Sequence, residues 1–457
     1  MAEQPVLIVG AGLCGTLLAL RLAQKGYKVR LHEKRADMRE QDQVAGRSIN
    51  LALSDRGLWA LEKVGVKEEI LKECIPMKGR LVHPLGEKSF LSPYSGRSGD
   101  YINSVSRAGL NIALLNKVES HHNIEIHFNS KCRQVDLETS EVVFREGTSG
   151  KSSTVKASVV IGADGAGSAV RRSMMAATSE LLFNYSQNFL THGYKELSIS
   201  PTESGGYRIE KNALHIWPRG DFMIIALPNI DGSFTLTMFN PMRGPEGFEY
   251  LQSDSAIKEF FEEYFPHLIE HCPHYLQEYK ENPVGILGTI KCYPWQAFGK
   301  TLVIGDAAHA IVPFYGQGMN ASFEDVRILD EIIDENAGDW SKVFEQFQQA
   351  RVENTNAIAD LAIDNFYEMR DRVDDEDFVK KRQLEMLLEN EYPDYYSKYS
   401  LVTFRPEVPY SKAMELGRKQ DEYLLDVCRS QVDFEDLDIP AIQQGLAKMA
   451  LEILHVS

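Results

Sequence analysis

The alternation of apolar and polar positions divides the chain into short strands, amphipathic helices and a long helical tail. Val6–Val9 is an apolar run of strand length, which leads through a glycine-rich turn into an apolar-periodic helix at residues 17–22. A turn at Gly26 and a second strand at residues 28–32 follow. Apolar runs bounded by glycine and followed by a helical period are typical of strand–turn–helix units. This pattern predicts the beginning of a Rossmann-type α/β domain.

A second unit of this kind lies at residues 302–325. Its short apolar run predicts a buried strand that breaks at Gly305 and Asp306, and Pro313 then interrupts the chain before a new helical pattern. Because the first N–H groups of a helix have no partner within it, that helix would present its positive end to a group that becomes anionic. The candidate donors are the N–H groups of Gly318, Met319 and Asn320. Taken alone, the same residues could form an ordinary strand–loop–helix.

Further strand patterns lie between these two units. Residues 124–128 and 155–161 predict strands on either side of a polar hairpin. Pieces at 213–217, 222–227 and 234–239 predict an antiparallel sheet with one face free to roof a pocket. The candidates for an apolar pocket wall are Leu214, Ile225, Leu227 and Phe239, although plain sheet core is the simpler interpretation.

The pattern is helical from Trp340 onward. It predicts helices at residues 343–357, 359–370, 378–390 and 410–428. Within the second of these, helical spacing brings three residues to one face, which could point to a substrate: Asn365, Glu368 and Met369. A solvated face is the alternative for Glu368.

Together these elements predict an α/β protein with a discontinuous Rossmann-type domain, an inserted antiparallel β-sheet domain and a helical C-terminal region. A chain of 457 residues suits two or three domains. We expect the Rossmann-type domain at residues 1–75, 101–180 and 291–345. The sheet domain is expected at 76–100 and 181–290, and the helical region at 346–457.

Composition narrows the possible partners. The formal net charge of −17 argues against nucleic acid or an anionic membrane surface as a partner. The six cysteines are scattered without a CxxC pair, which favours reduced thiols in a cytoplasm over disulfides or a zinc site. The sequence has no apolar run of membrane-spanning length, and residues 445–457 have an amphipathic helical pattern, so we expect no membrane anchor. No metal site is expected, and the oligomeric state, monomer or homodimer, stays open.

The first turn carries a dinucleotide fingerprint. Gly10, Gly12 and Gly15 form GxGxxG between strand and helix, and Glu33 ends the following strand. Such glycines let a pyrophosphate approach the backbone and let helix and strand pack closely. Glu33 would bind ribose hydroxyls. The motif cannot separate FAD from NAD, because both contain an ADP moiety.

Two more strand ends carry an acid beside glycine. Asp164 follows the strand pattern that ends at Ile161, and Asp306 follows the run at residues 302–304. Three such strand ends in one chain indicate one long cofactor bound by one discontinuous domain.

Four polar residues are candidates for ligand contacts. Arg47 and Asn50 lie beside the expected nucleotide end, and Arg107 opens a helix where it could meet a phosphate or ribityl chain. Arg80 lies in an alternating strand pattern and could face a cavity, where a guanidinium suits a carboxylate ligand. Simple surface polarity is an even alternative for Arg47 and Asn50.

GxGxxG with Glu33, GADG followed by Ser-x-x-Arg, and GDAAH with Pro313 resemble the three signature motifs of single-component FAD-dependent aromatic hydroxylases. The resemblance implies FAD as cofactor, with Asp306 at the ribityl chain and Asp164 between the FAD and NAD(P)H regions. It places the isoalloxazine ring beside Pro313, Phe314, Tyr315 and Gly316. The whole set expected to bind cofactor is Gly10, Gly12, Leu13, Gly15, Glu33, Arg35, Arg47, Asn50, Arg107, Asp164, Asp306, Gly318, Met319 and Asn320.

Later segments such as HGYKEL, NALHIWPRGDFMIIALPN and ENEYPDYYSKYSLVTF are similar to the branch of this family that hydroxylates L-kynurenine in tryptophan degradation. By resemblance, the carboxylate and its surroundings would be bound by Arg80, Tyr94, Asn365 and Tyr399. The pocket would be lined by Leu214, Ile225, Leu227, Phe239, Phe314, Glu368 and Met369. Tyr315 is a departure, since some relatives carry another ring or His there.

The resemblance implies that NADPH and O2 support hydroxylation to 3-hydroxy-L-kynurenine through a flavin C4a-hydroperoxide. The ring's own amino group activates the reacting carbon, so no catalytic base is expected, and His309 is expected to be structural. Two alternatives are a hydroxylase of another small aromatic acid and a non-catalytic carrier with a flavin fold. The NADPH-binding residues are not identified from the sequence.

Overall fold

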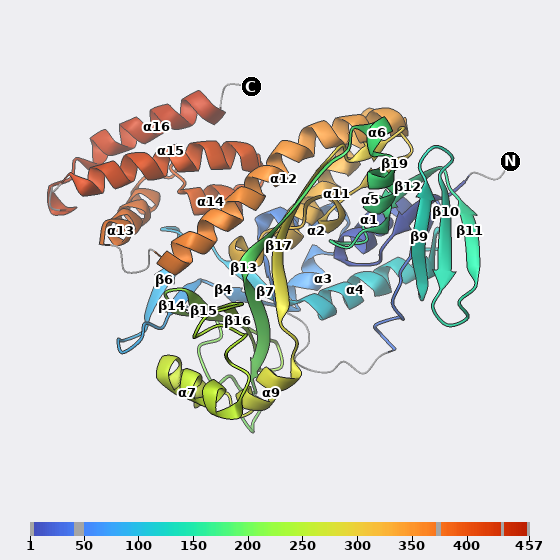
Figure 1. The fold of residues 1–457 in the computed structure, drawn as a ribbon. Helices are drawn as coiled ribbons and strands as arrows, with labels where there is room; N and C mark the ends of the chain where they lie inside the picture. The colour runs from blue at the N-terminus through green and yellow to red at the C-terminus, as the bar shows by residue number, and fades with distance from the viewer. Residues whose placement is uncertain (1–3, 41–49, 372–375, 431–433, 455–457) are drawn as a thin grey trace.

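The computed structural model describes residues 4–40, 50–371, 376–430 and 434–454, except for the side chains of residues 369–371. Figure 1 shows three parts: a Rossmann-type layer, a second sheet below it, and a group of helices near the C-terminus. The predicted fold class is confirmed. Among these residues, no helix is long and apolar enough to cross a membrane.

A six-stranded sheet forms the Rossmann-type part, and its strand order is β18-β19-β12-β1-β2-β8. All neighbouring strands are parallel except the β18–β19 pair. The central strands β1 and β12 are apolar and buried at every position, for example at Leu7 and Ile8, as expected for parallel strands covered on both faces. The strands are β1 Val6–Val9, β2 Val29–His32, β8 Ile124–His127, β12 Val159–Gly162, β18 Gln296–Ala297 and β19 Thr301–Val303.

Helices pack on this sheet and on one another. The main ones are α1 Leu13–Gln24, α2 Asp55–Lys63, α4 Arg107–Glu119, α5 Ala169–Ala176 and α11 Gly318–Glu335. A small sheet of β3 Asn50–Leu53, β4 Cys74–Met77 and β7 Ile102–Ser106 joins this part to the second sheet.

The strand predicted at residues 155–161 is wrong, because two strands of different sheets meet there. β11 Ser152–Lys156 belongs to a three-stranded antiparallel sheet with β9 Ser130–Asp136 and β10 Glu141–Glu146, whereas β12 belongs to the six-stranded sheet. Ala157 donates its N–H to the carbonyl of Ser140, and Ser158 donates to Pro5. These two hydrogen bonds hold the short connection between β11 and β12, where the chain passes from the three-stranded sheet to the six-stranded sheet.

The second sheet has seven strands in the order β17-β13-β16-β15-β14-β5-β6. It is antiparallel, as predicted, except that β5 and β14 pair in parallel. The strands are β5 Gly79–Val82, β6 Phe90–Pro93, β13 Asn184–Ile199, β14 Leu214–Arg219, β15 Phe222–Pro228, β16 Phe234–Pro241 and β17 Gly285–Tyr293.

Alternate residues of this sheet serve two faces. In β15, Ile224 and Ala226 pack on a helical layer, whereas Met223, Ile225 and Leu227 face the opposite way toward a cavity. The helical layer consists of α7 Asp254–Tyr264, α8 Pro266–Ile269 and α9 Tyr275–Glu281. Because both of its faces are covered, β15 is continuously apolar.

The C-terminal part contains α12 Trp340–Asp371, α13 Glu376–Glu391, α14 Lys398–Thr403, α15 Tyr410–Arg429 and α16 Ile439–Leu454. The prediction of two helices at 343–357 and 359–370 is wrong: α12 is continuous through Ile358, which is fully buried. The stretch contains no proline or glycine that would break the helix. α14 was not predicted.

Candidate functional site

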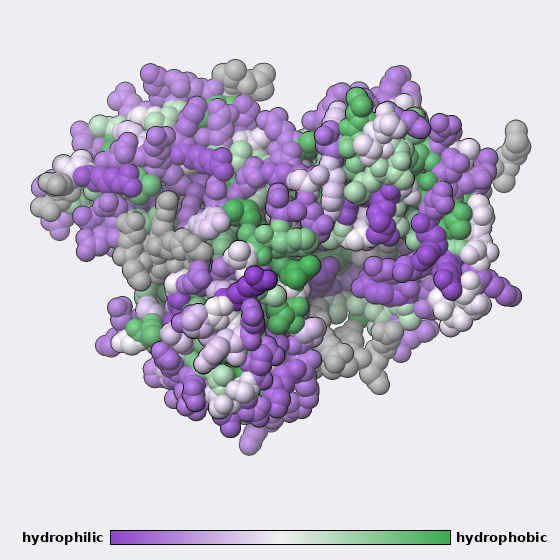
Figure 2. All heavy atoms as spheres, viewed as in Figure 1, coloured by the Kyte–Doolittle hydropathy of each residue, from purple (hydrophilic) through white to green (hydrophobic). Residues whose placement is uncertain are grey.

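One cavity of about 680 Å³ extends from the carboxyl ends of β1, β2 and β12 to the inner face of the seven-stranded sheet. Ligand sites of open α/β sheets lie at such strand ends. Figure 2 shows apolar residues gathered over β13 and β17 at the centre of the visible face. Ile286 of β17 is 67% exposed and also lines the cavity.

The glycine turn at one end of the cavity has the geometry that a pyrophosphate needs. Gly10 has φ +105°, and a Cβ there would lie 2.5 Å from the carbonyl oxygen of Ala163. A Cβ on Gly15 would meet the oxygen of Gly10 at 2.0 Å, so Gly15 serves helix packing rather than the cavity wall. Gly12 has open space instead, and the N-terminus of α1 behind it has no side-chain cap. Uncapped N–H groups beside open space suit an anionic group.

Glu33 lies beside this turn at the end of β2. One carboxylate oxygen accepts the N–H of Ala11 at 3.0 Å, and the other accepts Nε of Arg35 at 2.9 Å. Burial raises the pKa of Glu33, but these hydrogen bonds and the charge of Arg35 outweigh burial and hold the pKa below its ordinary value. The carboxylate thus stays ionised as an acceptor at the cavity edge.

The two other strand-end acids also line the cavity. Asp164 accepts bonds from the hydroxyl of Ser168 at 2.5 Å and from the N–H of Ala169 at 2.6 Å, so it caps α5. Burial raises the pKa of Asp164. Asp306 follows Gly305, whose φ of +60° turns the chain from β19 into the short helix α10 Asp306–His309.

Residues 313–318 form a loop at the middle of the cavity. A 3-10 turn at Pro313–Tyr315 is followed by Gly316 with φ +68°, and then by the N-terminus of α11, which has no side-chain cap. Gly318 and Met319 line the cavity there. The arrangement presents uncapped N–H groups of a long helix to the cavity, as the sequence predicted.

Asn320 lies behind the loop and not on the cavity. Its amide oxygen accepts the N–H of Ser54 at 3.0 Å, and its nitrogen donates to Ala52 and Gly316 at 2.8 and 2.9 Å. Its side chain therefore fastens the loop to β3.

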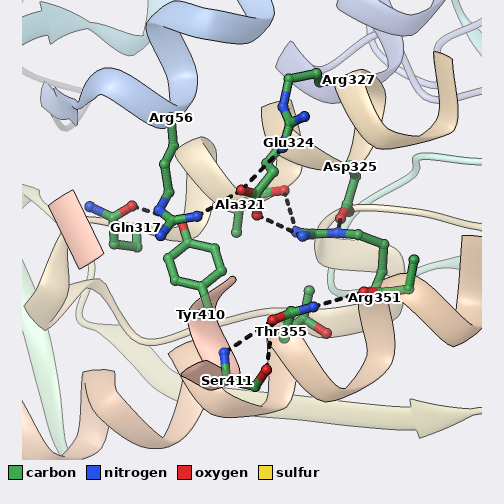
Figure 3. A network of polar contacts seen from close by, with 12 residues as sticks. Arg56, Gln317, Ala321, Glu324, Asp325, Arg327, Arg351, Thr355, Tyr410 and Ser411 are labelled. Carbon is green, nitrogen blue, oxygen red and sulfur yellow. Dashed lines mark hydrogen bonds and ion pairs between the residues drawn. The ribbon is translucent and has the colours of Figure 1, made fainter. Parts of the chain in front are cut away.

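A buried ionic network fixes α11 from the opposite side (Figure 3). Glu324 accepts bonds from Arg56 at 2.8 Å and Arg351 at 2.6 Å. Asp325 accepts Nε of Arg351 at 2.7 Å and pairs with His309 at 2.6 Å. His309 therefore has a buried structural partner in Asp325, in line with its expected role.

At the other end of the cavity, Arg80 lies against two stacked tyrosines. The Tyr94 and Tyr399 rings lie 5.4 Å apart at an interplanar angle of 9°. The guanidinium carbon of Arg80 is 5.7 Å from the first ring and 5.0 Å from the second. Within the described part of the chain, the buried hydroxyl of Tyr94 has no hydrogen-bond partner. A half-buried guanidinium beside an unpaired hydroxyl suits a carboxylate.

The apolar wall predicted from the strands lines the cavity between these two ends. Leu214, Ile225, Leu227 and Phe239 all contribute to it, together with Phe314 of the loop. The rings of Phe239 and Phe314 lie 4.9 Å apart. Arg35, Asn50, Arg107, Leu13, Pro313 and Tyr315 line the cavity too.

Two predicted substrate residues contact other parts of the chain instead of lining the cavity. Asn365 donates to the carbonyl of Phe314 at 2.6 Å, and Glu368 pairs with Lys398 at 2.5 Å. Both belong to α12, which packs behind the loop and α14. Arg47 and the side chain of Met369 lie outside the described residues.

Sequence reasoning missed part of the lining. Met223 lies two positions before Ile225, and Thr237 lies two positions before Phe239, so each shares a strand face with a predicted residue. The strand period could therefore have identified both. Ile286, Leu287 and Gly288 of β17 and residues 130–132 of β9 come from distant segments with no local signal.

Comparisons with known proteins agree with this geometry. The family described as "FAD binding domain" matches residues 3–244 and 247–345. Kynurenine 3-monooxygenase of Dictyostelium discoideum is 41% identical over 463 residues, which covers 98% of each chain. The enzyme of that name from Myxococcus xanthus is 41% identical over 438 residues, covering 96% of this chain and 93% of its own.

The fold is also similar to solved monooxygenases. For p-nitrophenol 4-monooxygenase PnpA from Pseudomonas putida, the TM-score is 0.69 at 16% identity, covering 90% of this chain and 98% of the other. For 2-methyl-3-hydroxypyridine-5-carboxylic acid oxygenase, it is 0.64 at 20% identity, covering 85% and 98%. At such identities the likeness shows the fold alone. Together with the full-length sequence relatives, these findings show that the chain belongs to the kynurenine 3-monooxygenase family of FAD-dependent aromatic hydroxylases.

Proposed function

We propose that the chain hydroxylates L-kynurenine to 3-hydroxy-L-kynurenine, with FAD as cofactor and with NADPH and O2 as co-substrates. The observation that carries the proposal is that one cavity joins the dinucleotide turn at Gly12 to Arg80 and its two tyrosines. The relatives of that name, 41% identical across nearly the whole chain, supply the substrate.

The residues present fit FAD. The open space at Gly12 and the uncapped start of α1 suit its pyrophosphate, and the ionised Glu33 suits ribose hydroxyls. Asp306, which lines the cavity, would bind the ribityl chain, and the uncapped N-terminus of α11 would face the ring system. When bound, FAD supplies the redox chemistry that activates O2.

The remaining work of the chain is binding and orientation. Arg80 and the hydroxyl of Tyr94 would hold the amino-acid carboxylate, while Tyr399 packs against both. The apolar wall, with Phe239 and Phe314, would hold the aromatic ring and exclude water from the reacting carbon. The aniline nitrogen of the substrate activates that carbon, so no side chain is needed as a base.

The proposal also covers the roles of Asn365 and Glu368, the division into domains and the cellular compartment. We propose that Asn365 acts through the Phe314 carbonyl and Glu368 through Lys398, rather than by direct contact. The three-part division at 1–75, 101–180 and 291–345, at 76–100 and 181–290, and at 346–457 is proposed with it. The six unpaired cysteines favour a reducing compartment such as the cytoplasm.

Two alternatives are less well supported. A hydroxylase of a phenolic acid needs a group that deprotonates the phenol, and the cavity lining offers no evident relay for it among the described residues. A carrier that has lost its chemistry would not need the complete dinucleotide turn.

NADPH consumption by the flavin-loaded protein tests the proposal. We expect L-kynurenine to stimulate consumption, and salicylate and 4-hydroxybenzoate to leave it unchanged. Stimulation by a phenolic acid instead would support the first alternative, and a protein that does not retain flavin would support the second.

A further inference from the structure

A buried cluster of charged side chains lies among the C-terminal helices, in contact with both tyrosines of the Arg80 site. Among the described residues it contains three cations and three carboxylates. Its members, from α12 to α15, are Glu368, Lys381, Arg382, Glu385, Lys398 and Asp421. None of the six lines the cavity.

Lys398 connects the cluster to Tyr399, the next residue in α14. Its ammonium lies 2.6 Å from Asp421 on α15 and 2.5 Å from Glu368 on α12. The alkyl chain crosses α15 at Gly417, where a Cβ would lie 2.5 Å from Cγ of Lys398. α15 thus has room for Lys398 only because residue 417 has no side chain.

Arg382 connects the same cluster to Tyr94. It donates to the carbonyls of Pro93 and Tyr94, each at 2.8 Å, and to Glu385 at 3.2 Å. Glu385 pairs with Lys381, and Lys381 pairs with Asp421 at 2.7 Å. A continuous series of ion pairs therefore joins the backbone of Tyr94 to Lys398.

The cluster also reaches the 313–318 loop. The hydroxyl of Tyr315 donates to the carbonyl of Lys398 at 3.5 Å, and its ring stacks on Tyr399 at 5.6 Å and 14°. Tyr399 is therefore held between Tyr94 on one side and Tyr315 on the other.

We propose that this ionic cluster positions Tyr94 and Tyr399 for carboxylate binding, with Lys398 and Arg382 as positioning residues that do not touch the substrate. The proposal rests on the proposed function, in which Arg80 and Tyr94 bind the carboxylate of L-kynurenine. Lys381, Glu385 and Lys398 are buried, and Glu368, Arg382 and Asp421 are partly buried, so the removal of one charge leaves an excess of the opposite charge in the cluster and moves α14. Tyr399 belongs to α14, and its ring contacts both the Tyr94 ring and the Arg80 guanidinium. A small movement of α14 therefore separates the Tyr399 ring from Arg80.

Lys398→Met and Asp421→Asn test the proposal, with L-kynurenine and its decarboxylated amine as the two ligands. We expect KM for L-kynurenine to rise about tenfold in each variant, while KM for the amine stays within about twofold. The rise in KM of the double variant should be smaller than the product of the two single rises, because both changes remove the Lys398–Asp421 pair. Lys419→Met removes an exposed ammonium of the same α15, paired with Glu415 at 3.4 Å, and should change neither KM.

Gly417→Ala provides a second perturbation that removes no charge. Its methyl group displaces Lys398, so it should reproduce the selective rise in KM for L-kynurenine. An equal loss with both ligands, or no change with either, overturns the positioning role. Failure of the proposed function would differ, because the unsubstituted protein itself would then show no preference for L-kynurenine over the amine.

Discussion

Arg56 donates a hydrogen bond from Nη1 to Oε1 of Glu324 at 2.8 Å. The two side chains are buried, and the two residues lie 268 positions apart in the sequence. The same guanidinium donates to the carbonyls of Val402 and Val408 at 2.7 and 2.6 Å and lies 3.9 Å from the Tyr410 ring. Arg56 thereby joins α2 and α11 to α14 and the segment that follows it, and Figure 3 shows its position beside Glu324 and Tyr410. The cofactor-side helices and the C-terminal helices are thus linked by one side chain.

Glu324→Ala should strongly destabilise the fold. The change leaves the buried guanidinium groups of Arg56 and Arg351 without their common carboxylate, which costs about 3–5 kcal/mol. Urea unfolding followed by tryptophan fluorescence measures the loss. Glu331→Ala on the same helix is the control, since Glu331 is 37% exposed and should cost at most about 1 kcal/mol. Equal effects of the two changes would refute the structural importance of the network.

Arg80→Met should raise KM for L-kynurenine about 10- to 100-fold, because a charged hydrogen bond to the carboxylate is lost. FAD should remain bound, since Arg80 lies at the far end of the cavity from the Gly12 turn. Steady-state kinetics and the flavin content of the purified variant provide the measurement. An unchanged KM would remove Arg80 from the carboxylate site.

Gly12→Ala should weaken FAD binding without destabilising the protein. The position has φ −74° and no atom within 4 Å of an added Cβ, so the apoprotein accommodates alanine, but the methyl group occupies the space proposed for the pyrophosphate. We expect the FAD Kd to rise at least about tenfold at an unchanged thermal midpoint. Gly99→Ala, also with open space around an added Cβ, is the control. A Gly12→Ala protein that retains full FAD affinity would place the pyrophosphate elsewhere.

How far the sequence predicts this protein depends on how local each feature is. The turns at Gly10 and Gly305 and the strands β14, β15 and β16 of the second sheet were predicted, because glycine and strand periods act within a few residues. The roles of Arg56 and Lys398 were not, because their partners lie 268 and 30 residues away and only the tertiary fold brings them together. For the same reason Asn365 and Glu368 were placed on the correct helix, whereas their contacts with Phe314 and Lys398 were not foreseen.

Acidification should destabilise the second sheet through His83 and His215. His215 donates from Nε2 to the carbonyl of Glu210 at 2.7 Å, which leaves its Nδ1 to accept from His83 at 2.9 Å. Burial, the neighbouring His215 and the charge of Arg219 lower the pKa of His83 from 6.5 to about 4. As the pH falls, His83 is protonated in the unfolded chain before it is protonated in the folded protein. The contribution of neutral His83 to the free energy of unfolding is therefore complete above about pH 6.5 and is lost as the pH falls toward about 4.

Thermal unfolding midpoints between about pH 7 and about pH 5 check this dependence. His83→Gln should flatten the fall in the midpoint over that interval. A variant with the same pH dependence as the unsubstituted protein would show that the pKa of His83 is the same in the folded and unfolded states.

The most direct test of the central claim is the mass of the product formed from L-kynurenine by the FAD-loaded protein with NADPH under isotopically labelled dioxygen. The cavity that joins the Gly12 turn to Arg80 predicts a product one oxygen atom heavier, carrying the label on the aromatic ring. NADPH oxidation without an oxygenated product, or a product that carries oxygen from water, would contradict the account.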